Sequence, residues 1–110
     1  SGKHSEFDIA VAADVFIYFG DLVSVLEVSA KSLRPDGLLF FTLELADESD
    51  TSTGYLLNPH GRFSHTPTYL DTALHKAGLI SLQKAAGSFR TEGGEPVNQM
   101  LVVARRTNSP

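Results

Sequence analysis

The stretch FDIAVAADVFIYFGDL, residues 7–22, and the later stretch LLFFTL, residues 38–43, decide the fold of this chain. Each contains a short, continuous apolar run, which is typical of a parallel strand covered on both faces. Between the two runs, Asp21 is a good N-cap, and apolar residues recur at helical spacing as far as Leu33. A strand, a helix and a second strand of this combined length predict a right-handed βαβ unit.

Turn-forming residues mark the boundaries of the next elements. The RPDG turn at residues 34–37 is expected to close the first helix, because proline fixes φ and glycine accepts a positive φ. Residues 45–65 are polar and rich in turn formers, which indicates a long functional or mobile loop. Thr66 and Pro67 then predict the start of a second helix, and Gly78 predicts its end.

The end of the chain predicts two strands. The first covers residues 79–89 and bends near Gly87, and the second covers residues 97–105. The short Gly-rich loop between them predicts an antiparallel hairpin. The expected order is therefore β-α-β-loop-α-β-β, an α/β chain. A receiver-like or flavodoxin-like domain is excluded, because the sheet of such a domain is wholly parallel.

The composition is ordinary for one globular domain: 110 residues, of which 42% are hydrophobic and 20% charged. The chain has no cysteine, which excludes disulfides, a thiolate nucleophile and Cys-ligated zinc. Its longest apolar stretch, Ile9–Phe19, is interrupted by Asp14 and is too short to span a bilayer. We therefore expect no membrane partner and, since no secretory leader is visible, a cytoplasmic location.

Charge is distributed unevenly along the chain. Residues 1–50 carry three Lys or Arg against ten Asp or Glu, whereas residues 51–110 carry six against three. The acidic first half will not bind a phosphate backbone by charge, and the cations of the second half are scattered. Nucleic acid is therefore not expected as a partner.

Four segments together resemble the carboxyl-terminal half of a class I S-adenosylmethionine-dependent methyltransferase. Residues 7–22 resemble its fourth strand and the following turn, and LRPDGLLFFTLE, residues 33–44, resembles its LkPGG turn and fifth strand, with Asp36 in place of a glycine. GRFSHTPTYLDTALHKAGL, residues 61–79, is similar to a subgroup of predicted methyltransferases often encoded behind tetratricopeptide repeats. FRTEGGEPVNQMLVVARR, residues 89–106, resembles the final hairpin of that subgroup.

This resemblance implies a partial, Rossmann-like sheet. The family has the strand order 3-2-1-4-5-7-6, and this chain would supply 4-5-7-6. The glycine-rich turn and the acidic residue that hold most of S-adenosylmethionine in the family have no match here. Gly93 and Gly94 do not replace the glycine-rich turn, because they lie between the last two strands. We expect residues 1–6 to be a tag or frayed leader, residues 7–106 a partial methyltransferase domain, and residues 107–110 a tail.

The implied function is transfer of a methyl group from S-adenosylmethionine to an unidentified acceptor by the parent protein, with this part inactive alone. Its implied partner is the missing amino-terminal half. Without that half, the first strand becomes a sheet edge and one sheet face loses its cover, so we expect a homo-oligomer such as a dimer. The alternative is a non-catalytic α/β interaction module that self-associates through an exposed sheet face or edge.

Two acidic residues are expected at the carboxyl ends of the parallel strands, where ligands of open α/β sheets bind. Asp14 either contacts the cofactor or caps the following turn. Glu44 either faces the substrate or belongs to a solvated acidic loop. The nearby Asp47, Glu48 and Asp50 lack the spacing of a calcium loop, and no histidine pair has zinc-binding spacing, so no metal site is predicted.

The segment most particular to the subgroup contributes further candidates. His65 is either the general base for an acceptor hydroxyl or amine, or a structural residue that fixes the loop. Arg62 either binds a substrate carboxylate or phosphate, or pairs with Glu44. Tyr18 and Tyr69 either line the substrate pocket or pack against strand ends. No GxSxG motif is present, which argues against a hydrolase.

Overall fold

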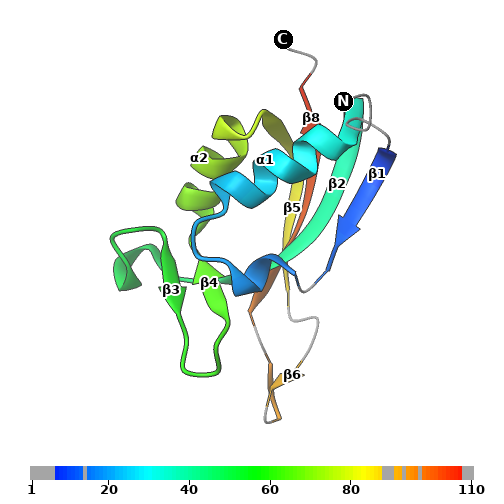
Figure 1. Ribbon diagram of the computed structural model, residues 1–110. Helices are drawn as coiled ribbons and strands as arrows, with labels where there is room; N and C mark the ends of the chain where they lie inside the picture. Colours follow the sequence, from blue (N-terminus) through cyan, green and yellow to red (C-terminus); the bar gives the residue numbers. More distant parts are fainter. Residues whose placement is uncertain (1–6, 14, 88–90, 93, 97, 108–110) are drawn as a thin grey trace.

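The computed structural model describes residues 7–13, 15–87, 91–92, 94–96 and 98–107 (Figure 1). Its elements in chain order are β1 (Phe7–Ala12), η1 (Phe16–Tyr18), α1 (Val23–Ser32), β2 (Leu33–Leu45), η2 (Glu48–Asp50), β3 (Tyr55–Leu57), β4 (Phe63–His65), α2 (Pro67–Lys76), β5 (Leu79–Gly87), β6 (Thr91–Glu92), β7 (Glu95–Pro96) and β8 (Gln99–Arg106).

The long strands form the sheet that the sequence predicts. β1 runs parallel to β2, and β8 lies antiparallel between β2 and β5. The spatial order β1-β2-β8-β5 is therefore the predicted 4-5-7-6 arrangement, a parallel βαβ unit followed by a returning antiparallel pair. Both of these predictions are confirmed.

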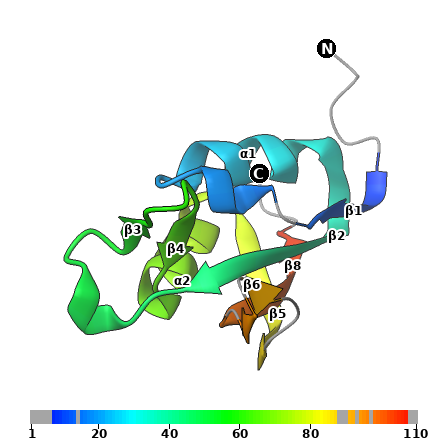
Figure 2. The ribbon, with the colours of Figure 1, turned by 90° about the horizontal axis from the view of Figure 1, so that it is seen from below.

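The hydrophobic core lies between this sheet and the helices. α1 and α2 lie on the same face of the sheet (Figures 1 and 2). The buried side chains of Leu39, Phe41 and Leu43 alternate along β2 and meet the helices on that face. The rings of Phe16 and Phe41 lie 4.9 Å apart between centroids, so η1 also packs on the core.

The start of β2 differs from the prediction. The RPDG segment, expected as a turn before the strand, lies inside β2 as an irregularity, and pairing with β1 shifts from Phe7–Leu33 to Ile9–Leu38. The positive φ, 66°, belongs to Asp36 and not to Gly37 as predicted. Gly37 is required there by space instead, because a Cβ would lie 2.8 Å from the Arg34 carbonyl oxygen. The chain nevertheless resumes the same strand direction, because β1 pairs with β2 on both sides of the irregularity.

The prediction of a long loop over residues 45–65 is also wrong in part. It contains η2 and a hairpin of β3 and β4, and β4 pairs in parallel with the end of β2 through Glu44–Ser64 and Leu45–His65. Strands of three residues are too short to produce a readable alternation of apolar and polar residues, which explains the difference.

The ends of the helices follow local chemistry. Thr66 Oγ1 accepts a hydrogen bond from the Tyr69 N–H, Pro67 occupies the first turn, and Gly78 has φ of 79°, as predicted. α1 begins at Val23, one residue later than an Asp21 N-cap requires, although Asp21 Oδ1 still accepts the Val23 N–H at 2.9 Å. Residues 88–90 of the predicted 79–89 strand and residue 97 of the last strand lie outside the described residues.

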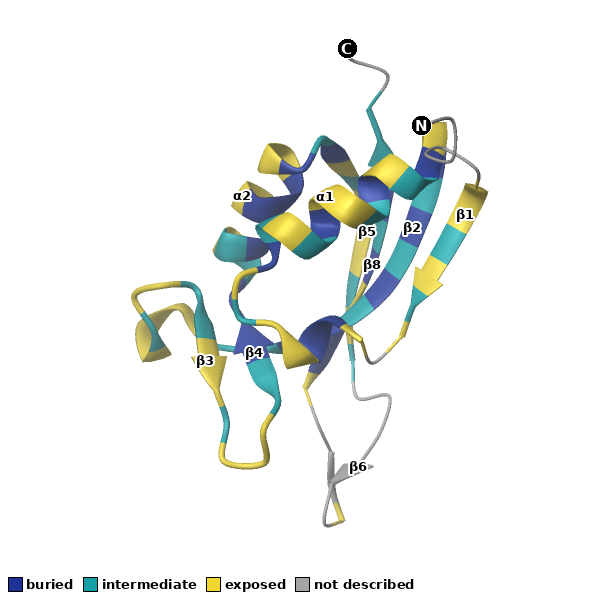
Figure 3. Cartoon of the chain, viewed as in Figure 1, coloured by how far each residue is buried: buried dark blue, intermediate teal, exposed yellow. Residues whose placement is uncertain are grey.

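The second face of the sheet has no helix packed on it among the described residues. We call this surface the open face. Pairing across β1, β2, β8 and β5 places apolar side chains side by side on it: Ile9, Val11, Leu38, Phe40, Ile80, Leu101 and Val103. Val11 is 71% exposed and Ile9 58%, and β1 is predominantly exposed along its length (Figure 3). No helix in the described part of the chain is long and apolar enough to cross a membrane.

Candidate functional site

The carboxyl ends of β1 and β2 lie at the same end of the sheet as η1 and the β3–β4 hairpin (Figure 1). This end brings together the predicted site residues that the structure describes. These residues are Tyr18 of η1, Glu44 of β2, Arg62 of the β3–β4 turn, His65 of β4 and Tyr69 of α2. Asp14 lies outside the described residues.

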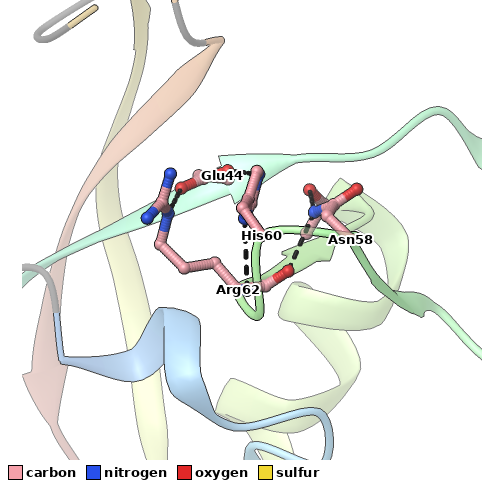
Figure 4. A network of polar contacts seen from close by, with 5 residues as sticks. Glu44, Asn58, His60 and Arg62 are labelled. Carbon is pink, nitrogen blue, oxygen red and sulfur yellow. Dashed lines mark hydrogen bonds and ion pairs between the residues drawn. The ribbon is translucent and has the colours of Figure 1, made fainter. Parts of the chain in front are cut away.

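Glu44 is buried and charged at the end of β2. Only 4% of the residue is exposed, and Arg62 Nε donates a hydrogen bond to its Oε2 at 2.9 Å (Figure 4). His60 Nε2 lies 3.9 Å from the other carboxylate oxygen. Glu44 is therefore no part of a solvated loop, and the pairing with Arg62 considered from the sequence is present.

The β3–β4 turn holds Arg62 in place for this pairing. Asn58 Nδ2 donates to the Arg62 carbonyl oxygen at 3.0 Å and to Ser64 Oγ at 2.7 Å, and the Asn58 N–H donates to the same carbonyl at 2.9 Å. The Arg62 N–H in turn donates to His60 Nδ1. Asn58 and His60 thus hold the backbone of Arg62, and the Glu44 carboxylate holds its guanidinium.

His65 connects β4 to the segment that follows η1. Its Nε2 lies 2.8 Å from the Phe19 carbonyl oxygen and 3.1 Å from that of Gly20. Carbonyl oxygens only accept, so Nε2 carries the hydrogen. Nδ1 is buried and has no hydrogen-bond partner among the described residues. Burial lowers the pKa of His65, and the two carbonyl contacts offset only part of this effect, so the ring is neutral at pH 7.

Tyr69 holds the next two residues of the same segment. Its hydroxyl accepts the Leu22 N–H at 2.8 Å and donates to Asp21 Oδ1 at 3.3 Å, and burial raises the pKa of Tyr69. The Tyr69 ring stacks on His65 with 6.1 Å between centroids, and Tyr55 packs edge-on against Tyr69 at 5.4 Å. We call Tyr55, His65 and Tyr69 the aromatic clamp. It binds residues 19–22.

Gly20 fits this clamp because it has no side chain. A Cβ at Gly20 would lie 2.7 Å from Tyr55 Cε1 and 2.9 Å from Phe63 Cε1. Sequence reasoning did not identify Gly20, Tyr55 or Phe63 as site residues. The one available signal was the glycine that directly follows the aromatic run of η1, and it did not reveal which residues pack against it.

Tyr18 differs from Tyr69 in its exposure. It lies in η1, just after β1, and is 60% exposed, whereas the Tyr69 hydroxyl is engaged with the backbone. Tyr18 is therefore the more exposed of the two tyrosine candidates. Tyr69 is half-buried and lines a pocket beside Thr53 and Thr68.

The neutral state of His65 predicts that stability depends on pH. In the unfolded chain the group titrates near its ordinary pKa of 6.5, above its folded value, so the unfolded state takes up the proton first. The stabilisation is fully present above pH 6.5 and is lost as the pH falls through the lower, folded pKa. Urea unfolding across this range measures the loss.

Two substitutions separate this effect from general acid unfolding. His65→Gln keeps an N–H donor for the carbonyls but cannot titrate, so its free energy of unfolding should vary less with pH below 6.5. His75→Gln, at an exposed position of α2, is the matched control and should follow the native chain. An unchanged pH dependence in His65→Gln would contradict the assignment.

Comparison with known proteins identifies the fold of the chain. No protein-family model and no curated protein matches the chain. A solved SAM-dependent methyltransferase from Methanosarcina mazei superposes with a TM-score of 0.76 over 96% of this chain and 62% of that chain, at 14% identity. The chain has the fold of a methyltransferase.

Two further solved structures, a methyltransferase and a cyclase, also superpose on this chain. The 1,6-didemethyltoxoflavin-N1-methyltransferase of Burkholderia thailandensis, solved with S-adenosylhomocysteine, gives a TM-score of 0.69 at 19% identity, over 96% of this chain and 46% of that chain. The [4+2]-cyclase SpnF gives 0.74 at 15% identity, over 96% and 52%. This chain spans between 46% and 62% of the length of these three proteins. Similarity to methyltransferases encoded behind tetratricopeptide repeats stays a prediction.

The described residues do not form a cradle for S-adenosylmethionine by themselves. Such a cradle needs glycines whose missing side chains leave room for a ligand. Between β1 and α1 the described glycine is Gly20, and the rings of Tyr55 and Phe63 already fill the space beside it. Gly61 and Gly94 have open space around them, but each lies in a turn between two antiparallel strands.

Proposed function

We propose that this chain is the acceptor-side part of an S-adenosylmethionine-dependent methyltransferase. The observation that carries the proposal is the aromatic clamp on residues 19–22, at the carboxyl end of β1. Ligands of open α/β sheets bind beyond this end, and the methyltransferase fold of the chain agrees with that placement. Residues 19–22, which His65 and Tyr69 hold by hydrogen bonds, therefore form a fixed surface at this end of the sheet.

The described residues take different roles in this proposal. Tyr18 is exposed and contacts the methyl acceptor. His65 and Tyr69 hold residues 19–22, which directly follow Tyr18 in the chain. Arg62 holds Glu44 at the end of β2. S-adenosylmethionine supplies the methyl group when bound. The contribution of this chain is orientation, which lowers the barrier of a bimolecular reaction by holding the acceptor in line.

The proposal assigns most of the cofactor site to another part of the parent protein, which is the implied amino-terminal half. β1 pairs with β2 but with no second described strand, and its FDIAVA sequence is that of a central strand. A strand laid along this edge would bring a glycine-rich turn to the end of the sheet occupied by η1. The acceptor stays unassigned by chemical class.

Titration calorimetry with S-adenosylhomocysteine tests the proposal. We expect no measurable binding to this chain, and binding to the longer polypeptide that carries the proposed cofactor-binding part. In that longer polypeptide, Tyr18→Ala should lower methyl transfer, while the exposed helix variant Val28→Ala serves as the matched control. Tight binding to the short chain would contradict the division of the site, and no binding to either polypeptide would contradict the function.

A second candidate is a non-catalytic module that acts by association. The exposed apolar side chains of the open face favour it, because patches of this kind mark interaction surfaces. The same titration separates the two candidates, since such a module binds no cofactor in either polypeptide.

A further inference from the structure

A cleft of about 330 Å³ lies between the last turns of α1 and α2. Three cationic side chains from different elements line it: Lys31 of α1, Lys76 of α2 and Arg106 of β8. One carboxylate, that of Glu27, lines it as well. Three cations against one carboxylate leave a formal charge of +2, in a chain whose formal net charge is −4. Positive charge is therefore concentrated in this cleft against the overall charge of the chain.

The Lys and Arg side chains outside the cleft are arranged differently. In the part of the chain that the structure describes, each of them is paired with a carboxylate: Arg34 with Asp8, Arg62 with Glu44, Lys84 with Asp71 and Arg105 with Asp36. The ammonium groups of Lys31 and Lys76 have no ion-pair partner among the described residues. A lysine in the last turn of a helix offsets the helix dipole. This effect accounts for one lysine on each helix, but not for their convergence with an arginine of a strand.

The floor of the cleft is made of small residues on a tied backbone. Ala30 and Ala77 line the cleft and are buried, and Gly78 beside them ends the turn after α2 with φ of 79°. The Gly78 carbonyl accepts hydrogen bonds from the N–H and the hydroxyl of Thr107 at 3.0 Å and 3.1 Å. Side chains without bulk leave the space between the helices, and these hydrogen bonds hold its border in place. The cleft is therefore formed before any ligand arrives.

We propose that this cleft binds a phosphate group. A phosphate monoester carries a charge of about −1.5 to −2 at pH 7, which balances the charge of the lining side chains. Lysine binds phosphate as a point charge, and the arginine guanidinium adds N–H donors in a planar fork. The volume lies at the lower end of the range for small-molecule sites, about 300 to 1,000 Å³. The chemical class is therefore a small phosphorylated molecule or the free phosphate ion.

This inference is independent of the proposed methyl transfer. Arg106 Nη1 donates to the carbonyl oxygen of Leu33, the first residue of β2, whereas Glu44 of the candidate site lies next to the last residue of the same strand. The cleft is thus at the opposite end of the sheet from the candidate site. It is bordered by α1, α2 and β8, and not by the β1 edge at which a further strand is proposed.

Amide NMR spectra of the 110-residue chain, titrated at constant ionic strength, test the inference. We expect glycerol 3-phosphate to shift the amide signals of Ala77, Gly78 and Thr107 in a saturable way, and uncharged glycerol to leave them in place. A parallel titration with inorganic phosphate separates the two sources of the group. Tighter binding of the ester supports a phosphorylated molecule as the ligand, and tighter binding of inorganic phosphate supports the free ion. The absence of saturable shifts with both would overturn the inference.

Three substitutions locate the binding. Lys76→Gln should weaken it about tenfold, because it removes a charged hydrogen-bond donor. Lys84→Gln is the matched control, since it removes the same charge outside the cleft, and it should leave the dissociation constant unchanged. Glu27→Gln removes the opposing carboxylate and should tighten binding about two- to fivefold, a gain that misfolding does not produce. Equal weakening by Lys84→Gln, or no tightening by Glu27→Gln, would overturn the inference in favour of attraction by overall charge.

Discussion

Replacing Gly54 by alanine is expected to lower the free energy of unfolding by more than about 3 kcal/mol. Gly54 has φ of 97°, and a Cβ there would lie 2.4 Å from the Cβ of Tyr69. The backbone cannot move aside freely, because the Gly54 carbonyl accepts the Thr66 N–H at 2.9 Å. Any shift therefore disturbs the first turn of α2 and, through Tyr69, the aromatic clamp.

Gly61→Ala is the matched control for this substitution. Gly61 has a similar φ of 91°, but nothing lies within 4 Å of the position its Cβ would take. Its cost should be the conformational term alone, about 1 to 2 kcal/mol. Urea unfolding of both variants measures the difference. Equal losses in the free energy of unfolding would contradict the prediction, because they would mean that the clash with Tyr69 adds nothing to the cost of Gly54→Ala.

The sheet was predictable because its signals are local. The apolar runs of β1 and β2 and the helical spacing between them each lie within one short window, and the order β1-β2-β8-β5 follows once the family resemblance is added. Thr66, Pro67 and Gly78 mark the limits of α2 through their own backbone chemistry. The positions of such strands and helix ends depend on residues close in sequence, so they can be predicted without knowing the tertiary packing.

Only part of the membership of the candidate site was predictable, because Tyr55 of the aromatic clamp was missed. Glu44, Arg62, His65 and Tyr69 were identified, and one of the contacts considered for Arg62 is present. The partners of His65 are backbone carbonyls 46 and 45 residues away, and those of Tyr69 are similarly distant. The spacing of residues in the sequence does not encode bonds over such separations, whether to the carbonyls that His65 contacts or to the Leu22 N–H and Asp21 carboxylate that Tyr69 contacts. These contacts emerge only from the packing of β4 and α2 against the segment after η1.

Arg62→Met is expected to lower the free energy of unfolding by about 3 kcal/mol, the second large effect in this chain. Methionine preserves much of the volume and apolar stem of arginine but leaves the Glu44 carboxylate without its hydrogen-bonded cation. The side chains of Glu44 and Arg62 are 5% and 13% exposed, so water replaces the lost partner poorly. Chemical unfolding at pH 7 measures the loss.

A double-mutant cycle separates this penalty from simple loss of packing. Glu44→Gln together with Arg62→Met removes both charges, so the double variant should regain much of the stability lost by Arg62→Met alone. The ion pair of Arg34 with Asp8, whose side chains are 57% and 76% exposed, provides the control, and Arg34→Met should cost less than about 1 kcal/mol. If the double variant is no more stable than Arg62→Met, the buried carboxylate is not the source of the loss, and Arg62 stabilises the end of β2 through its packing instead.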